Sequence, residues 1–171
     1  TSAKIILRKK PNAKGLYPLA VRITKDRRST YKHIGHYIEL EDNYDARFVE
    51  EALSSGVIHL SGGDTFRFLF WLKKRELDVV IKNCAIEGKP IIGVSAGAMI
   101  LTPSIDSALL CGDINTIGLA GTSALDVIPF LFMPHSTGEA DEMLKASNLA
   151  TSKGTKLILC SDDDAVLVIK G

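Results

Sequence analysis

The sequence has no apolar run of the roughly 20 residues that a membrane-spanning helix requires, and its basic front lacks the apolar region of a signal peptide. Three cysteines in 171 residues lie far apart, so they form neither a disulfide framework nor a C-x-x-C metal motif. Together these absences predict a cytoplasmic protein with reduced thiols.

Acidic residues are almost absent from the first 36 positions. That region has ten Lys or Arg and a single acid, whereas residues 37–171 have eleven bases and nineteen acids. The two parts therefore carry net charges of +9 and −8, although the whole chain is close to neutral at +1. Such an asymmetry predicts that the two parts face different partners.

The basic region reads as a small antiparallel β meander, with strands expected at Lys4–Lys10, Tyr17–Thr24 and Ser29–Ile38. These residues resemble the arm-type DNA-binding domain at the front of phage-type tyrosine recombinases, over about residues 1–45. The resemblance implies contact with DNA phosphates, whose affinity would fall steeply with salt. The alternative is a solvated basic sheet without a ligand. The candidate DNA-binding residues are Arg8, Lys10, Arg22, Arg27 and Arg28.

The most informative stretch follows later, at residues 89–101. A short apolar run that predicts a buried strand leads into Gly93-Val94-Ser95-Ala96-Gly97, and a helix-compatible run comes next. Strand, G-x-S-x-G and helix in this order are typical of a nucleophile elbow, in which glycines two residues before and after the serine allow a tight turn. A chance match is the alternative. We interpret Ser95 as a candidate nucleophile, with the amide of Ala96 placed to stabilise an oxyanion.

Strands and helices alternate through the rest of the chain, which predicts an α/β protein with a layered, partly parallel sheet. A helix is expected from Thr65 to about Arg75, with Phe66, Leu69 and Phe70 on one face. A last strand is expected at Ala165–Ile169.

The glycine pair in Ser61–Thr65 lies between a predicted strand and a predicted helix, where free amides can hold a phosphate or an oxyanion. This segment lacks the Lys-Ser/Thr ending of a P-loop and the third glycine of a dinucleotide fingerprint, so no cofactor is expected. The turn at Ser161–Asp164 is interpreted as solvated, and no metal is expected.

His135 follows the apolar run Val127–Met133, at the end of an expected strand. A lone histidine there is usually structural. Because the carboxyl ends of parallel strands meet at one edge of a sheet, it would share that edge with Ser95. His135 is therefore a candidate general base.

Two motifs resemble the peptidase E and cyanophycinase family: Ser61–Phe66 and Gly88–Ala98, together with Pro103 and Pro134-His135. The resemblance covers about residues 46–171 and implies serine peptidases on the class I glutamine-amidotransferase-like fold. It implies Ser95 as nucleophile, His135 as base, and the amides of Gly63 and Ala96 as oxyanion hole. Known members cleave dipeptides with an N-terminal aspartate or aspartyl-arginine polymers.

Two features depart from that family. Asp64 stands where members usually have Asn, and the opening strand–helix–strand region of the family is replaced by the basic segment. The predicted organisation is therefore a basic β segment at 1–45 and a shortened peptidase-like domain at 46–171. A sheet without its first strands leaves an apolar edge, which predicts self-association. The alternative function is a DNA-binding module fused to a non-catalytic or truncated peptidase-like domain.

The histidine of such a site needs an acceptor on its second ring nitrogen. Two acids after the elbow are candidates, Asp106 and Asp113. Asp113 is preferred, because Asp106 lies too close to the elbow helix to swing round to His135, and because peptidase E has an aspartate in a similar place. The alternative is that both are solvated loop residues and that a backbone carbonyl holds the histidine.

Overall fold

The computed structural model of the protein describes residues 2–7, 19–25, 28–33, 40 and 44–169. The chain divides into two compact units, Thr1–Ser55 and Gly56–Gly171, which are described separately. Within the described residues, no helix combines the length and the apolar character needed to cross a membrane.

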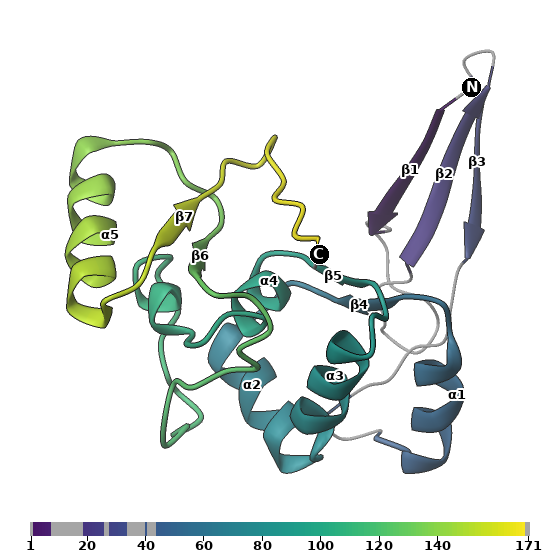
Figure 1. The fold of residues 1–171 in the computed structure, drawn as a ribbon. Helices are drawn as coiled ribbons and strands as arrows, with labels where there is room; N and C mark the ends of the chain where they lie inside the picture. Colours follow the sequence, from purple (N-terminus) through teal and green to yellow (C-terminus); the bar gives the residue numbers. More distant parts are fainter. Residues whose placement is uncertain (1, 8–18, 26–27, 34–39, 41–43, 170–171) are drawn as a thin grey trace. The chain divides into compact units, whose positions relative to one another are not determined.

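The first unit contains a three-stranded antiparallel sheet in the order β1-β2-β3, formed by Ser2–Leu7, Leu19–Lys25 and Arg28–His33 (Figure 1). Its register sets Lys4 opposite Arg22. A short 3-10 turn, Ala46–Phe48, and helix α1, Val49–Ser54, follow. Among the candidate DNA-binding residues, Arg22 and Arg28 lie in β2 and β3, whereas Arg8, Lys10 and Arg27 lie outside the described residues.

The second unit is a mixed α/β structure with parallel strands, which confirms the predicted class at this level. Strand β4 (Ile58–Leu60) pairs in parallel with β5 (Ile91–Gly93), and β6 (Leu131–Met133) pairs in parallel with β7 (Leu157–Leu159). The helical elements between and after the strands are α2 (Thr65–Lys74), α3 (Leu77–Ile86), α4 (Ala96–Ile100), η2 (Asp106–Leu109) and α5 (Ala140–Lys153).

Helix α2 holds the centre of this unit together. Phe66, Leu69 and Leu72 recur at a spacing of three on one face and are at most 2% exposed. The helix packs against α3 and α4, and Met99 and Ile100 of α4 are equally buried (Figure 1). Burying each of these side chains contributes about 1.5–3 kcal/mol. The packing thereby holds the helix that follows the glycine pair against the helix that follows Ser95.

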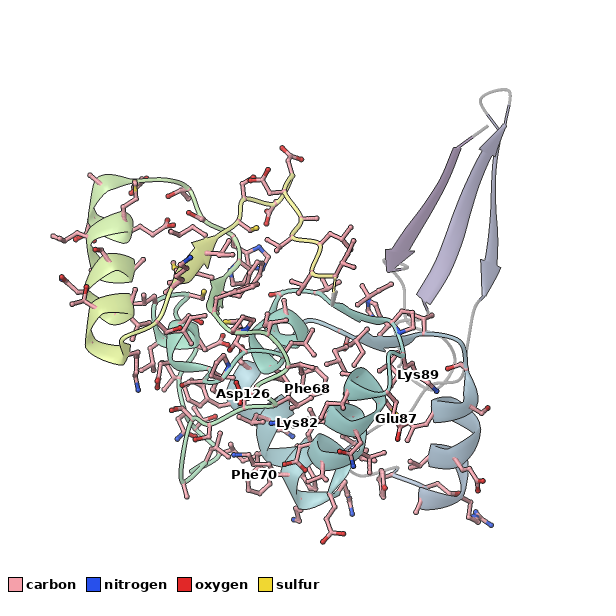
Figure 2. The ribbon with its side chains drawn as sticks, in the orientation of Figure 1. Phe68, Phe70, Lys82, Glu87, Lys89 and Asp126 are labelled. Atoms are coloured by element: carbon pink, nitrogen blue, oxygen red, sulfur yellow. The ribbon has the colours of Figure 1, made fainter. Side chains whose placement is uncertain are left out.

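An ion pair at the surface joins α3 to the segment before β6. The Nζ atom of Lys82 lies 3.8 Å from Oδ2 of Asp126, and the two side chains are 40% and 59% exposed (Figure 2). Such an exposed pair contributes little to stability. Asp126 is therefore a suitable position for a control substitution.

One predicted strand does not form. Residues 165–169 alternate poorly but are apolar, and the sequence predicted a strand there; the structure leaves them without strand pairing, and Leu167 and Ile169 are 83% and 78% exposed. In the described part of the chain, β7 pairs only with β6, so no further strand covers this segment. The result is an exposed apolar segment in the second unit.

Candidate active site

The site lies where the parallel strands end. The register of the first strand pair sets Leu60 opposite Gly93, so the glycine pair after β4 and the serine after β5 leave the sheet at the same edge. Gly62 comes two residues after the end of β4, and Ser95 comes two residues after the end of β5. A Cβ atom placed on Gly62 would lie 3.3 Å from Cβ of Ser95, which shows how closely the two turns approach.

The second strand pair repeats this arrangement. Its register sets Met133 opposite Leu159, and the chain continues past these ends to His135 and to Asp162. The common edge therefore explains how two side chains 27 positions apart in the sequence meet. Ser95 and His135, which the sequence predicted for this edge, are brought together by the fold.

The turn at Ser95 has the conformation of a nucleophile elbow. Ser95 has φ 53° and ψ −115°, a strained combination for a residue with a side chain. A Cβ atom on Gly93 would lie 2.6 Å from Cα of Ala98, and one on Gly97 would lie 2.2 Å from the carbonyl oxygen of Leu60. Both contacts are far too short for any side chain, which confirms the predicted need for glycine on each side of the serine.

Oγ of Ser95 lies 2.8 Å from Nε2 of His135. The other ring nitrogen, Nδ1, lies 2.5 Å from Oδ1 of Asp162. When Nδ1–H donates to the carboxylate, Nε2 is free to accept the hydroxyl proton of the serine. The side chains of His135 and Asp162 are 57% and 79% exposed, so this end of the site is open to water.

Asp113, the acid that the sequence favoured as partner of the histidine, lies elsewhere. Its Oδ2 accepts a hydrogen bond from the backbone amide of Thr65 at 3.0 Å. The cause is the local backbone: the amide of Asp113 donates to the carbonyl of Ala108 at 3.0 Å, and Gly112, at φ +88°, turns the chain so that Asp113 faces the start of α2.

Asp106 is not at the histidine either. Its carboxylate accepts from Oγ of Ser104 at 2.6 Å and forms an ion pair with Lys153. The acid on the histidine is Asp162, which sequence reasoning treated as part of a solvated turn. The contact depends on the parallel pairing of β7 with β6, which brings the residues after the two strands together.

Glu142 of α5 holds the loop that follows the histidine. Its carboxylate accepts hydrogen bonds from the hydroxyl of Ser136, and from the amide and the hydroxyl of Thr137 at 3.0 and 2.9 Å. The bond from Ser136, followed by those from Thr137, lowers the pKa of Glu142. Sequence reasoning missed this contact, although an acid in the first turn of a helix commonly bonds back to the preceding residues.

Two backbone amides follow the ends of β4 and β5: that of Gly63, next to Gly62, and that of Ala96, next to Ser95. Within the described part of the chain, neither the amide of Gly63 nor that of Ala96 donates a hydrogen bond. Gly63 has φ +142°, a conformation that residues with side chains rarely adopt. Free amides beside a serine hydroxyl can stabilise a negative oxygen in a reaction intermediate.

A pocket of about 270 Å³ opens beside His135. Its apolar part includes Met133 and Pro134, and its polar part includes Glu139 and Lys145. Cys111 also lines it, and burial raises the pKa of this thiol to about 11. The thiol therefore stays neutral near pH 7 and does not compete with the serine as a nucleophile.

An α/β unit with a serine on a strained strand–turn–helix and a histidine and a carboxylate in line with it has the architecture of serine hydrolases with a nucleophile elbow. The sequence pattern of Peptidase family S51 matches residues 22–171, which is most of the chain. The protein belongs to peptidase family S51.

The relatives that the chain resembles are named as peptidases. The chain is 31% identical over 116 residues to the uncharacterized peptidase PM1590 of Pasteurella multocida, covering 66% of this chain and 56% of that protein. It is 36% identical over 78 residues to peptidase E of Shewanella oneidensis, covering 46% of this chain and 32% of that protein. The chain thus matches between 32% and 56% of the length of these relatives.

The fold agrees with a solved structure. A protein from Listeria monocytogenes EGD-e, assigned as a peptidase E, superimposes with a TM-score of 0.58 at 23% identity, covering 73% of this chain and 61% of that one. The family match begins at residue 22, inside the region that the sequence assigned to a recombinase-like arm. Nothing in these comparisons supports the arm resemblance.

Proposed function

We propose that the protein is a serine-type peptidase that works through an acyl-enzyme on Ser95. The observation that carries this proposal is the 2.8 Å contact between Oγ of Ser95 and Nε2 of His135, on an elbow where Ser95 has a φ of 53°. Membership of peptidase family S51 supports it.

In the proposed reaction, Oγ of Ser95 attacks the scissile carbonyl while His135 takes the hydroxyl proton. The amides of Gly63 and Ala96 stabilise the negative oxygen of the tetrahedral intermediate. His135 then gives its proton to the leaving amine, and water hydrolyses the acyl-enzyme by the same sequence of steps. Asp162 holds the ring with Nδ1–H toward its carboxylate and stabilises the imidazolium as it forms.

The proposed substrates are short peptides with an N-terminal aspartate. Support comes from the resemblance of the two motifs to peptidase E and from relatives that carry this name. With matched dipeptides that begin with Asp, Asn or Ala, we expect kcat/KM for Asp to exceed that for Asn and for Ala by about tenfold or more, because a site that pairs with a carboxylate leaves its own polar groups unpaired when the substrate lacks one. Equal hydrolysis of all three would contradict the aspartate preference, and release of no amino acid from any would contradict peptidase activity.

We also infer that the basic region, residues 1–36, is a candidate for binding DNA. The charge of this region favours it, with ten bases against one acid. Affinity for duplex DNA should fall steeply as salt rises, with a slope of several units in a plot of log affinity against log salt concentration, because each phosphate contact releases a counterion. Replacing Arg22 and Arg28 by Glu should weaken binding to all sequences alike. A flat salt response, or no binding at low salt, would reject this function.

A further inference from the structure

A short segment connects the two halves of the site. It runs from Asp106 to Asp113 and comprises η2 and the turn after it; we call it the brace. On one side, Oγ of Ser107, which is fully buried, donates to the carbonyl of Phe132 at 2.7 Å, within the strand that leads to His135. Further along, Sγ of Cys111 lies 3.8 Å from the carbonyl of Pro134, the residue immediately before the histidine.

The other side of the brace reaches the turn between β4 and α2, residues 61–64, which contains Gly63. Oδ2 of Asp113 accepts the backbone amide of Thr65, 48 positions away in the sequence and two residues after Gly63. Thr65 is fully buried, so water cannot replace this acceptor. Asp113 is the only part of the brace with a hydrogen bond to this turn among the contacts of the described residues.

Resting on the proposed peptidase function, we propose that Asp113 is a positioning residue for the oxyanion hole. Its carboxylate holds the amide of Thr65 and thereby holds the turn that contains Gly62, which lies against Ser95, and Gly63, whose amide is the proposed oxyanion donor. It does not act as the acid of the histidine, because Asp162 occupies Nδ1 of that ring.

The start of α2 explains why an acid is suited to this role. The N-terminal amides of a helix carry partial positive charge, and a carboxylate interacts favourably with them. Two acids accept hydrogen bonds from amides in the first turn of α2. Oδ1 of Asp64 accepts the amide of Arg67 at 2.8 Å, and Oδ2 of Asp113 accepts the amide of Thr65 at 3.0 Å. Asp64 belongs to the turn itself, whereas Asp113 ties the turn to the brace.

The roles of oxyanion anchor and triad acid predict opposite results for one substitution. In a triad, an asparagine favours the wrong histidine tautomer and inactivates the enzyme. At the start of α2, an asparagine still presents a carbonyl oxygen that accepts the amide of Thr65. If Asp113 only holds the amide of Thr65, the enzyme should therefore stay active with Asp113→Asn and lose activity with Asp113→Ala.

The experiment compares wild type, Asp113→Asn and Asp113→Ala, with Asp126→Asn as a matched control on the exposed ion pair with Lys82. The first measurement is hydrogen exchange at the amide of Thr65. We expect Asp113→Ala to raise its exchange rate about tenfold or more, Asp113→Asn to change it little, and Asp126→Asn to leave it at the wild-type value. Unchanged protection in Asp113→Ala would overturn the anchor.

The second measurement separates kcat from KM for the dipeptide that wild type cleaves best. An oxyanion hole acts on the transition state, so Asp113→Ala should lower kcat by about tenfold to a hundredfold with KM nearly unchanged, and Asp113→Asn should restore kcat to within a few-fold of wild type. Equal inactivation by Asn and Ala, with Thr65 still protected in Asn, would overturn the proposal in favour of a charge-dependent role. If wild type itself cleaves nothing, the peptidase function fails, while the exchange measurement still decides the anchor.

Discussion

Replacing Ser95 by alanine should abolish both hydrolysis and labelling by a fluorophosphonate probe. The hydroxyl of Ser95 is the group held 2.8 Å from the histidine on the elbow, and removing it leaves no oxygen for the acyl-enzyme. Loss of a serine nucleophile typically lowers turnover by about 10⁴-fold or more. Turnover and the mass shift of the labelled protein are the measurements.

The matched control is Ser152→Ala, which removes a serine hydroxyl on the exposed face of α5, where it donates to the carbonyl of Leu149. This variant should label and turn over like wild type. Alanine fits the elbow as well as serine does, so the Ser95 variant should remain folded. Labelling that persists in Ser95→Ala would refute the nucleophile assignment, and a folded wild type that takes up no probe would favour the non-catalytic alternative.

The elbow is the part of the site that could be predicted from the sequence with most detail. Its information is local: a strand, two glycines and a helix lie within a dozen residues, and the steric demands of the turn allow few alternatives. A Cβ atom on Gly97 would clash with the carbonyl of Leu60, in a second strand, yet the requirement for glycine was already visible in the spacing.

The assignment of the acid failed for the opposite reason. The sequence offers two candidates, Asp106 and Asp113, which both lie between the serine and the histidine. It favours Asp113 for its position and for the resemblance to peptidase E, and it indicates a solvated turn at Asp162. The deciding information is non-local: β7 pairs in parallel with β6, so the residues that follow their carboxyl ends meet. Strand pairing is set by tertiary packing, which a single sequence does not display.

The short helices and strands show a similar limit. The sequence predicted a strand at 165–169 from apolar composition, but a strand also needs a partner, and none pairs with this segment among the described strands. By contrast, α2 has its buried face every three residues, and this periodicity correctly placed Phe66 and Leu69 in the core. Phe70, predicted for the same face, is only half-buried and packs edge-on against Trp71.

The tautomer of His135 depends on which acid accepts a hydrogen bond from its Nδ1 atom. A serine hydroxyl gives up its proton only if Nε2 carries none, and this tautomer is selected by an acceptor on Nδ1. Asp162 provides that acceptor at 2.5 Å from a turn that is largely open to water. Because exposure weakens the contribution of a charged pair, this carboxylate should matter less than the buried acid of a typical triad.

Replacing Asp162 by asparagine should therefore lower kcat by about 10²- to 10³-fold, somewhat less than the roughly 10⁴-fold loss seen when a buried triad aspartate is changed in this way. The physical reason is that the amide group of asparagine can donate to Nδ1, which favours the tautomer with its proton on Nε2 and blocks the serine. The change is isosteric and lies in an exposed turn, so the melting temperature should stay close to that of wild type. Asp163→Asn is the matched control, since Asp163 is the next residue of the same exposed turn. Steady-state kinetics on the two variants decide the point: if Asp162→Asn keeps the turnover of Asp163→Asn, the contact with His135 has no part in catalysis.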